Sequence, residues 1–305
     1  MKDNPFYKQV DLLLKLLPIL ATEPDFALHG GTAINFFVRD MPRLSVDIDL
    51  TYLPIESRDA TFTNITKKLR DLAKKFRNAF AGIQISEKED KQRSISKLFV
   101  THQNALVKIE PNLIIRGSVF PIEERDLSKN AEKKFEKFVS VKTLPLHALY
   151  GGKICAALDR QHPRDLFDIK LLLENEGFTE NVRKAFLVYL ISGNRPMNEL
   201  LNPMLKDGRK VFENEFLGMT FIPVKYAALE KARKDLIRVI HKDLTDDDRR
   251  FLVSFKEGVP QWDLLGIEGV SKLPAVEWKL INLARMDRQK HAKAVAELKE
   301  VLGVS

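Results

Sequence analysis

Asp47 and Asp49 are residues whose type and spacing point to metal-dependent chemistry. They lie two residues apart in SVDIDLTYL, where acidic residues alternate with apolar ones in the pattern of a half-buried strand. Both carboxylates therefore project from the same face of that strand, and they repel each other unless a cation lies between them. Mg²⁺ binds one or two carboxylates and completes its octahedron with nucleotide phosphates. Taken alone, the motif also fits a chance pair on an exposed strand.

A glycine pair precedes this strand and could approach a phosphate. Gly30 and Gly31 in LHGGTAINFF allow backbone N–H groups to come close to a ligand, and Thr32 stands at a predicted helix start. The N–H groups and the dipole of a helix start favour a bound phosphate. A plain turn followed by a helix cap is the alternative interpretation.

Glu110 is a candidate third carboxylate. In LVKIEPN, Glu110 shares the polar face of a later predicted strand with Lys108 and Asn112. If this strand lies beside the Asp47–Asp49 strand, the three acids form a cluster that could hold two metal ions. One ion would lower the pKa of an attacking hydroxyl, and the other would balance the leaving pyrophosphate. By itself, Glu110 would be an ordinary exposed glutamate.

A second block of charged residues lies in YGGKICAALDRQHPRDLFDIK. Lys153 and Arg160 are seven residues apart and share one helical face, while Asp165 and Asp168 are three apart on the next predicted helix. Pro163 begins that second helix, so the corner can bring Lys153 near Asp165. A lysine there offers a compact positive charge for the β- and γ-phosphates. The alternative is a salt bridge that ties the two helices together, which we favour for Arg160 but not for Lys153 and Asp165.

The elements that must position these side chains are of two kinds. Up to about residue 120 the pattern predicts a small α/β unit, and from about residue 140 helical periodicity dominates. We therefore predict a core domain over residues 1–138 and a helical domain over residues 139–305 that completes the active site and forms the acceptor cleft. In the core we expect a strand in FALHGG, helices over 5–20, 32–40 and 64–80, and strands over 45–53, 82–86, 96–102 and 105–115, the last three mutually antiparallel.

Composition and charge limit the class of protein. The 305 residues contain no membrane span and no signal-peptide pattern, so we expect a cytoplasmic protein. The single cysteine, Cys155, excludes an internal disulfide and a cysteine-rich zinc site. The net charge of +8 suggests a polyanionic partner, and residues 64–97 hold ten Lys or Arg against four acids. Both phosphate-backbone binding and a merely solvated basic face are consistent with the predicted helix over 64–80.

Together these motifs resemble the nucleotidyltransferase fold of the polymerase-β superfamily, and within it the AbiEii/MenT-type toxin nucleotidyltransferases. The resemblance rests on an acid in a later strand and on the motifs Gly30-Gly31-Thr32 and Arg43-x-Ser45-x-Asp47-x-Asp49. The second block is also similar to one found in those proteins, with Lys153, Arg160 and the motif Arg164-Asp165-x-x-Asp168. The implied fold class is α+β: an N-terminal mixed sheet flanked by helices, followed by a mostly helical C-terminal domain.

The resemblance implies an enzyme that transfers NMP from an NTP with Mg²⁺ or Mn²⁺, in the MenT branch to the 3′ end of tRNA. It also implies the toxin of a toxin–antitoxin or phage-defence pair, with a cognate antitoxin as partner. From the motifs and the resemblance we expect Asp47, Asp49, Lys153 and Asp165 to be catalytic, Asp47, Asp49 and Glu110 to bind metal, and Gly30, Gly31, Thr32, Ser45, Lys153 and Asp168 to bind the NTP. The alternatives are an enzyme that modifies a protein acceptor, a nuclease, and a non-catalytic nucleotide-binding regulator.

Overall fold

The structure of the chain, a computed structural model, describes residues 5–89 and 94–304. It forms two compact units. The sheet unit consists of Met1–Leu149 and Gly218–Pro223, and the helical unit consists of Tyr150–Leu217 and Val224–Ser305.

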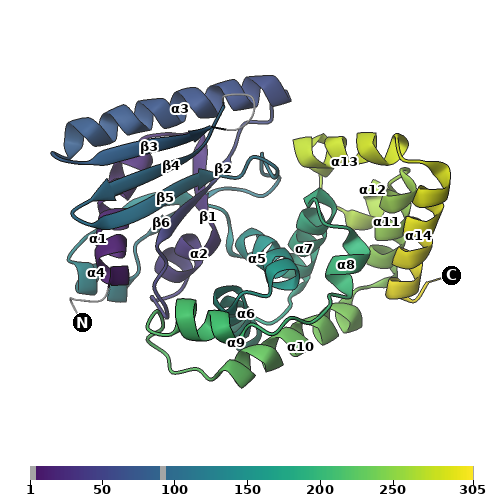
Figure 1. Cartoon of the computed structure of the whole chain (residues 1–305). Helices are drawn as coiled ribbons and strands as arrows, with labels where there is room; N and C mark the ends of the chain where they lie inside the picture. Colours follow the sequence, from purple (N-terminus) through teal and green to yellow (C-terminus); the bar gives the residue numbers. More distant parts are fainter. Residues whose placement is uncertain (1–4, 90–93, 305) are drawn as a thin grey trace. The chain divides into compact units, whose positions relative to one another are not determined.

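A mixed seven-stranded sheet organises the sheet unit, with the strand order β3-β4-β5-β2-β1-β7-β6 (Figure 1). The β2–β5 and β1–β7 pairs are parallel, and the other four neighbouring pairs are antiparallel. The strands are β1 (Phe26–His29), β2 (Asp47–Tyr52), β3 (Gln84–Glu89), β4 (Ile95–His102), β5 (Ala105–Pro111), β6 (Glu123–Asp126) and β7 (Ser140–Thr143). The mixed sheet with flanking helices confirms the predicted α+β class.

The sequence pattern predicted five of these strands, β1 to β5. Strands β3, β4 and β5 pair antiparallel in sequence order, as predicted. The sequence did not indicate β6 and β7, which are four residues long. The sequence of β6, EERD, has no apolar residue to alternate, so no pattern marks it as a strand.

The sheet unit extends beyond the predicted boundary after residue 138. Strand β7 follows that boundary but pairs with both β1 and β6, which makes it part of the sheet. A later segment, Gly218–Pro223, also belongs to this unit, and the amide of Leu44 donates to the carbonyl of Met219 at 2.7 Å. Strand β7 thus belongs to the sheet unit, whose first segment ends at Leu149.

Two long helices cover one face of the sheet. Helix α1 (Pro5–Leu20) contacts β5, helix α3 (Arg58–Ala79) contacts β4, and the two helices contact each other (Figure 1). The buried residues of α3 recur at helical spacing, which confirms an amphipathic basic helix. The shorter helices are α2 (Gly30–Ala33), its π-helical continuation η1 (Ile34–Val38), and α4 (Lys129–Phe135).

Local capping signals define the helices that follow β7. Pro163 is the first residue of α6, the side chain of Thr245 caps α11, and Pro274 begins α13. These elements are α5 (Leu146–Arg160), α6 (Pro163–Asn175), α7 (Glu180–Ser192), α8 (Met197–Leu201), α9 (Arg209–Val211), η2 (Phe212–Phe216), α10 (Tyr226–Asp243), α11 (Asp246–Glu257), α12 (Trp262–Leu265), η3 (Val270–Lys272), α13 (Pro274–Ala284) and α14 (Arg288–Leu302). Among the described residues, none of the helices has the length and apolarity needed to cross a membrane.

Candidate active site

The turn between β1 and α2 requires glycine at position 30. Gly30 has φ +72°, in the left-handed region that residues with side chains rarely adopt. A Cβ at this position would lie 2.4 Å from Oδ2 of Asp49. This contact follows from the antiparallel register of β1 and β2, which pairs His29 with Asp49. Because Gly30 has no side chain, its backbone can lie close to the Asp49 carboxylate.

The residues after Gly30 fix the start of β2. The Thr32 hydroxyl donates to the Asp47 carbonyl at 2.5 Å and lies at hydrogen-bond distance, 3.0 Å, from the Ser45 hydroxyl. Both side chains are buried. A Cβ on Gly31 would lie 3.0 Å from the same Ser45 oxygen and 2.9 Å from Nη2 of Arg43. The glycine–threonine motif and the serine before Asp47 are therefore one packed unit that holds the strand bearing the aspartates, and their contact with an NTP stays a prediction.

The strand placement expected for Glu110 is confirmed. Strands β2 and β5 are parallel neighbours, with Asp47 opposite Lys108 and Asp49 opposite Glu110. Asp47 and Asp49 are half-buried on the same face of β2, with the apolar Ile48 buried on the other. Because of this register, the three acids that we predict to be metal ligands occupy neighbouring positions on two adjacent strands.

Two lysines bind the Glu110 carboxylate. Lys97 Nζ lies 2.5 Å from one of its oxygens, and Lys108 Nζ lies 2.9 Å from the other. Burial raises the pKa of Glu110, but the hydrogen bonds and charges of the two lysines outweigh burial and lower it overall. Burial alone would lower the pKa of Lys108, yet Glu110 and the nearby charges of Asp47 and Asp49 raise it. Two lysines thus offset part of the negative charge of the three acids.

Within residues 5–89 and 94–304, no group of three or more His, Cys, Asp or Glu side chains is arranged to hold a metal ion. Glu110 is engaged by its lysines, so its role as a metal ligand stays a prediction. The donor set nonetheless fits a hard divalent cation, because Asp47 and Asp49 supply paired carboxylate oxygens. The missing side chain of Gly30 also leaves space at Oδ2 of Asp49 that a Cβ would fill.

Sequence reasoning did not assign a role to Lys97 and Lys108. The signal for Lys108 was present, since it lies two residues before Glu110 and so shares its strand face. Lys97 is thirteen positions away in sequence and comes close only through the antiparallel pairing of β4 with β5. A sequence without a known strand register could not reveal that contact.

The helical unit brings Lys153 together with both predicted aspartates. Lys153 Nζ lies 3.0 Å from Asp165 Oδ1 and 3.1 Å from Asp168 Oδ2, and all three side chains are at most 7% exposed. Arg160, whose side chain is largely exposed, also pairs with Asp165 at 2.9 Å. Burial raises the pKa of Asp165, but the charges of Lys153 and Arg160 lower it overall. The predicted approach of Lys153 to Asp165 across the α5–α6 corner is confirmed.

Comparison with known proteins identifies the family. A sequence model of the family described as "Nucleotidyl transferase AbiEii toxin, Type IV TA system" matches residues 11–282. The chain belongs to the AbiEii family. In fold it is similar to MenT4, a nucleotidyltransferase toxin from Mycobacterium tuberculosis H37Rv, with a TM-score of 0.63 and 16% sequence identity over 92% of this chain and 93% of that one. No curated protein matches.

Family membership makes the protein a nucleotidyltransferase toxin of a type IV toxin–antitoxin system. NTP is therefore its substrate, and a cognate antitoxin is its partner. Enzymes of this class use a divalent metal ion, in agreement with the paired carboxylates of β2.

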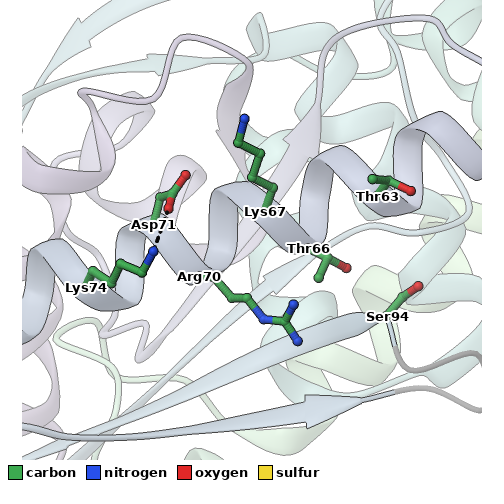
Figure 2. A pocket seen from close by; sticks show the side chains of 7 residues that line it. All are labelled: Thr63, Thr66, Lys67, Arg70, Asp71, Lys74 and Ser94. Atoms are coloured by element: carbon green, nitrogen blue, oxygen red, sulfur yellow. Dashed lines mark hydrogen bonds and ion pairs between the residues drawn. The ribbon is translucent and has the colours of Figure 1, made fainter.

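The basic helix of this AbiEii enzyme carries fewer unpaired charges than its sequence suggests. Lys68 lies 2.6 Å from Asp25 and Lys75 lies 2.6 Å from Glu23, so these two lysines stabilise the packing of α3. Lys67, Arg70 and Lys74 instead line a pocket on α3 (Figure 2), and its volume is about 480 Å³. The remaining residues lining it are Thr63, Thr66, Asp71 and Ser94.

Acids also lie close to this pocket. Arg70 is 3.6 Å from Glu87 and 3.7 Å from Glu89 on β3. Lys74 is 3.5 Å from Asp71, and Figure 2 shows this pair. The local charge is thus nearly balanced, which favours a solvated surface over a strong polyanion site. Asp90, Lys91 and Arg93, which the charge count included, lie outside the described residues.

The glycine turn gives a direct test of the site in this AbiEii enzyme. We expect Gly30→Ala to reduce transfer by roughly 10²-fold or more, because its Cβ would displace the Asp49 carboxylate. The matched control is Gly82→Ala. Gly82 has a similar φ of +76°, but its Cβ would meet nothing within 4 Å.

Both substitutions should cost about 1 kcal/mol of unfolding free energy for the left-handed backbone, measured by chemical denaturation. Only Gly30→Ala should lose activity. Equal activity of the two variants would contradict a role for the space beside Asp49.

Proposed function

We propose that this AbiEii-family toxin transfers an NMP from an NTP to the 3′ end of tRNA, with Mg²⁺ as its metal ion, and that it acts in phage defence. The observation that carries the proposal is the β2–β5 register, which sets Glu110 beside Asp49 and next to a glycine turn with no room for a side chain. Membership of the family supports the transfer chemistry. The net charge of +8 supports a polyanionic acceptor such as RNA.

In this proposal the acids of the sheet unit bind the metal ion. Asp47 and Asp49 would hold it, and Glu110, which pairs with Lys97 and Lys108 in the structure, would be the third ligand. When bound, Mg²⁺ lowers the pKa of the acceptor hydroxyl and balances charge on the leaving pyrophosphate. Lys97 and Lys108 would offset part of the negative charge of the three acids.

In this proposal the phosphate groups of the NTP bind to residues of the glycine motif that precedes β2 and to Lys153. The turn at Gly30 and Gly31 and the hydroxyls of Thr32 and Ser45 form the N-terminal part of this proposed site. Lys153 supplies positive charge to the β- and γ-phosphates, where negative charge builds up during transfer. Asp165 and Asp168 position the Lys153 ammonium through the two ion pairs that they form with it.

The decisive experiment incubates the enzyme with each α-³²P-labelled NTP, Mg²⁺ and total RNA. We expect one NTP to label RNA of tRNA size, with the label removed by trimming of the 3′ end. A parallel incubation with RNA-free lysate tests for a protein acceptor.

Label on protein alone would indicate that the acceptor is a protein and not RNA. Shortened RNA would indicate a nuclease, and tight NTP binding without pyrophosphate release would indicate a non-catalytic regulator. Any of these three results would overturn the proposed transfer to tRNA.

A further inference from the structure

Arg116 is a buried cation to which the described residues supply no anion. Its side chain is 6% exposed, and its Nε and Nη1 atoms have no hydrogen-bond partner. Within residues 5–89 and 94–304, no carboxylate forms an ion pair with it. Burial and the positive charge of Arg58 both lower the pKa of Arg116. A guanidinium keeps its proton in proteins, so burial leaves a positive charge that only a bound anion can compensate.

A second arginine shares the same aromatic ring. The Arg58 guanidinium carbon lies 4.8 Å from the centre of the Phe62 ring, and that of Arg116 lies 5.6 Å from it. The face of an aromatic ring attracts cations but does not neutralise them. Arg58, Phe62 and Arg116, here called the Arg116 cluster, therefore hold two positive charges close together.

The backbone around Arg116 is held firmly. The side chain of Asn112 accepts hydrogen bonds from the amides of Ile114 and Ile115, at 3.0 and 2.9 Å. The amide of Gly117 then donates to the carbonyl of Tyr52 at 2.8 Å. These bonds fix the turn beside the end of β2, so the backbone that carries Arg116 is positioned before any ligand binds.

The Arg116 cluster lies beside the end of β2, the strand that carries the aspartates. Tyr52, whose carbonyl binds Gly117, follows Asp49 by three residues on β2. Three residues of a strand span about 10 Å. A phosphate at the cluster therefore lies within reach of a substrate that reacts at Asp47 and Asp49.

We propose that Arg116 and Arg58 bind a phosphate group beside the Phe62 ring. Arginine binds phosphate through two parallel N–H donors, and the negative charge of a backbone phosphate would compensate the buried guanidinium of Arg116. The phosphate belongs either to the backbone of the acceptor RNA or to the NTP. Both sources are the substrates of the proposed function, on which this inference rests. The acceptor RNA is the source that we expect, because the glycine turn and Lys153 are already assigned to the phosphates of the NTP.

The test compares two exposed arginines of α3. Arg58→Gln removes a cation of the cluster, whereas Arg70→Gln removes one that lies between Glu87 and Glu89. Binding of fluorescein-labelled total tRNA is measured by anisotropy at several salt concentrations, and binding of each NTP by calorimetry, both without turnover. We expect Arg58→Gln to weaken tRNA binding about tenfold and to reduce the salt slope by roughly 0.7 to 0.9, while Arg70→Gln binds like the wild type.

A second variant, Arg116→Gln, should weaken tRNA binding at least as much as Arg58→Gln does. A loss of NTP affinity in place of tRNA affinity would assign the phosphate to the NTP. Unchanged affinity for both ligands in Arg58→Gln, or an equal loss in Arg70→Gln, would overturn the proposal. These assays measure binding without transfer. A failure to modify tRNA in the transfer assay would therefore refute the proposed function without deciding whether the Arg116 cluster binds phosphate.

Discussion

Replacing Asp47 by asparagine should lower nucleotidyl transfer on the order of 10³-fold or more while the fold stays intact. Asparagine keeps the shape of the side chain but removes the negative charge that binds a divalent cation. The backbone of residue 47 is held independently, because its carbonyl accepts from the Thr32 hydroxyl. Asp47 is half-buried, so the substitution should change the unfolding free energy by less than about 1 kcal/mol.

The measurement is transfer of label from the preferred NTP, with the melting temperature recorded on the same preparation. Asp126→Asn is the matched control, since it makes the same substitution on the exposed side of another strand of the sheet. The control should be fully active. Full activity of Asp47→Asn would rule out Asp47 as a metal ligand, and equal losses in both variants would point to a general effect of charge.

The sequence predicted the parts of this fold that depend on repeating patterns. Alternation of acidic and apolar residues located β2 and its two aspartates on one face, and helical spacing located the basic face of α3. The corner between α5 and α6 was visible because Pro163 can only begin a helix there. Each of these features is set by neighbouring residues in the chain.

Contacts between distant segments could not be read in the same way. The pairing of Glu110 with Lys97 depends on the register of β4 with β5, which no local pattern specifies. The same holds for α3, where Lys68 and Lys75 proved to be paired with acids that follow α1. The sequence gives the number of charges on a helix, but the tertiary fold decides which of them remain available to a ligand.

Lys153 should have a large effect on both activity and stability, and the two effects can be separated. It is buried between Asp165 and Asp168, so Lys153→Met leaves two buried carboxylates with only Arg160 as the remaining partner from this cluster. Removing one member of a buried ion pair costs about 3–5 kcal/mol of unfolding free energy. If Lys153 also contacts the triphosphate, transfer should fall by roughly 10²- to 10³-fold.

A charge-balanced variant distinguishes catalysis from structure. Lys153→Met combined with Asp165→Asn and Asp168→Asn removes the buried charges together, so most of the lost stability should return. We expect transfer to stay low in this triple variant, because the positive charge that Lys153 supplies to the β- and γ-phosphates is still missing. Denaturant unfolding and transfer assays on the single and triple variants provide the comparison. Recovery of transfer together with stability would show that Lys153 only ties α5 to α6.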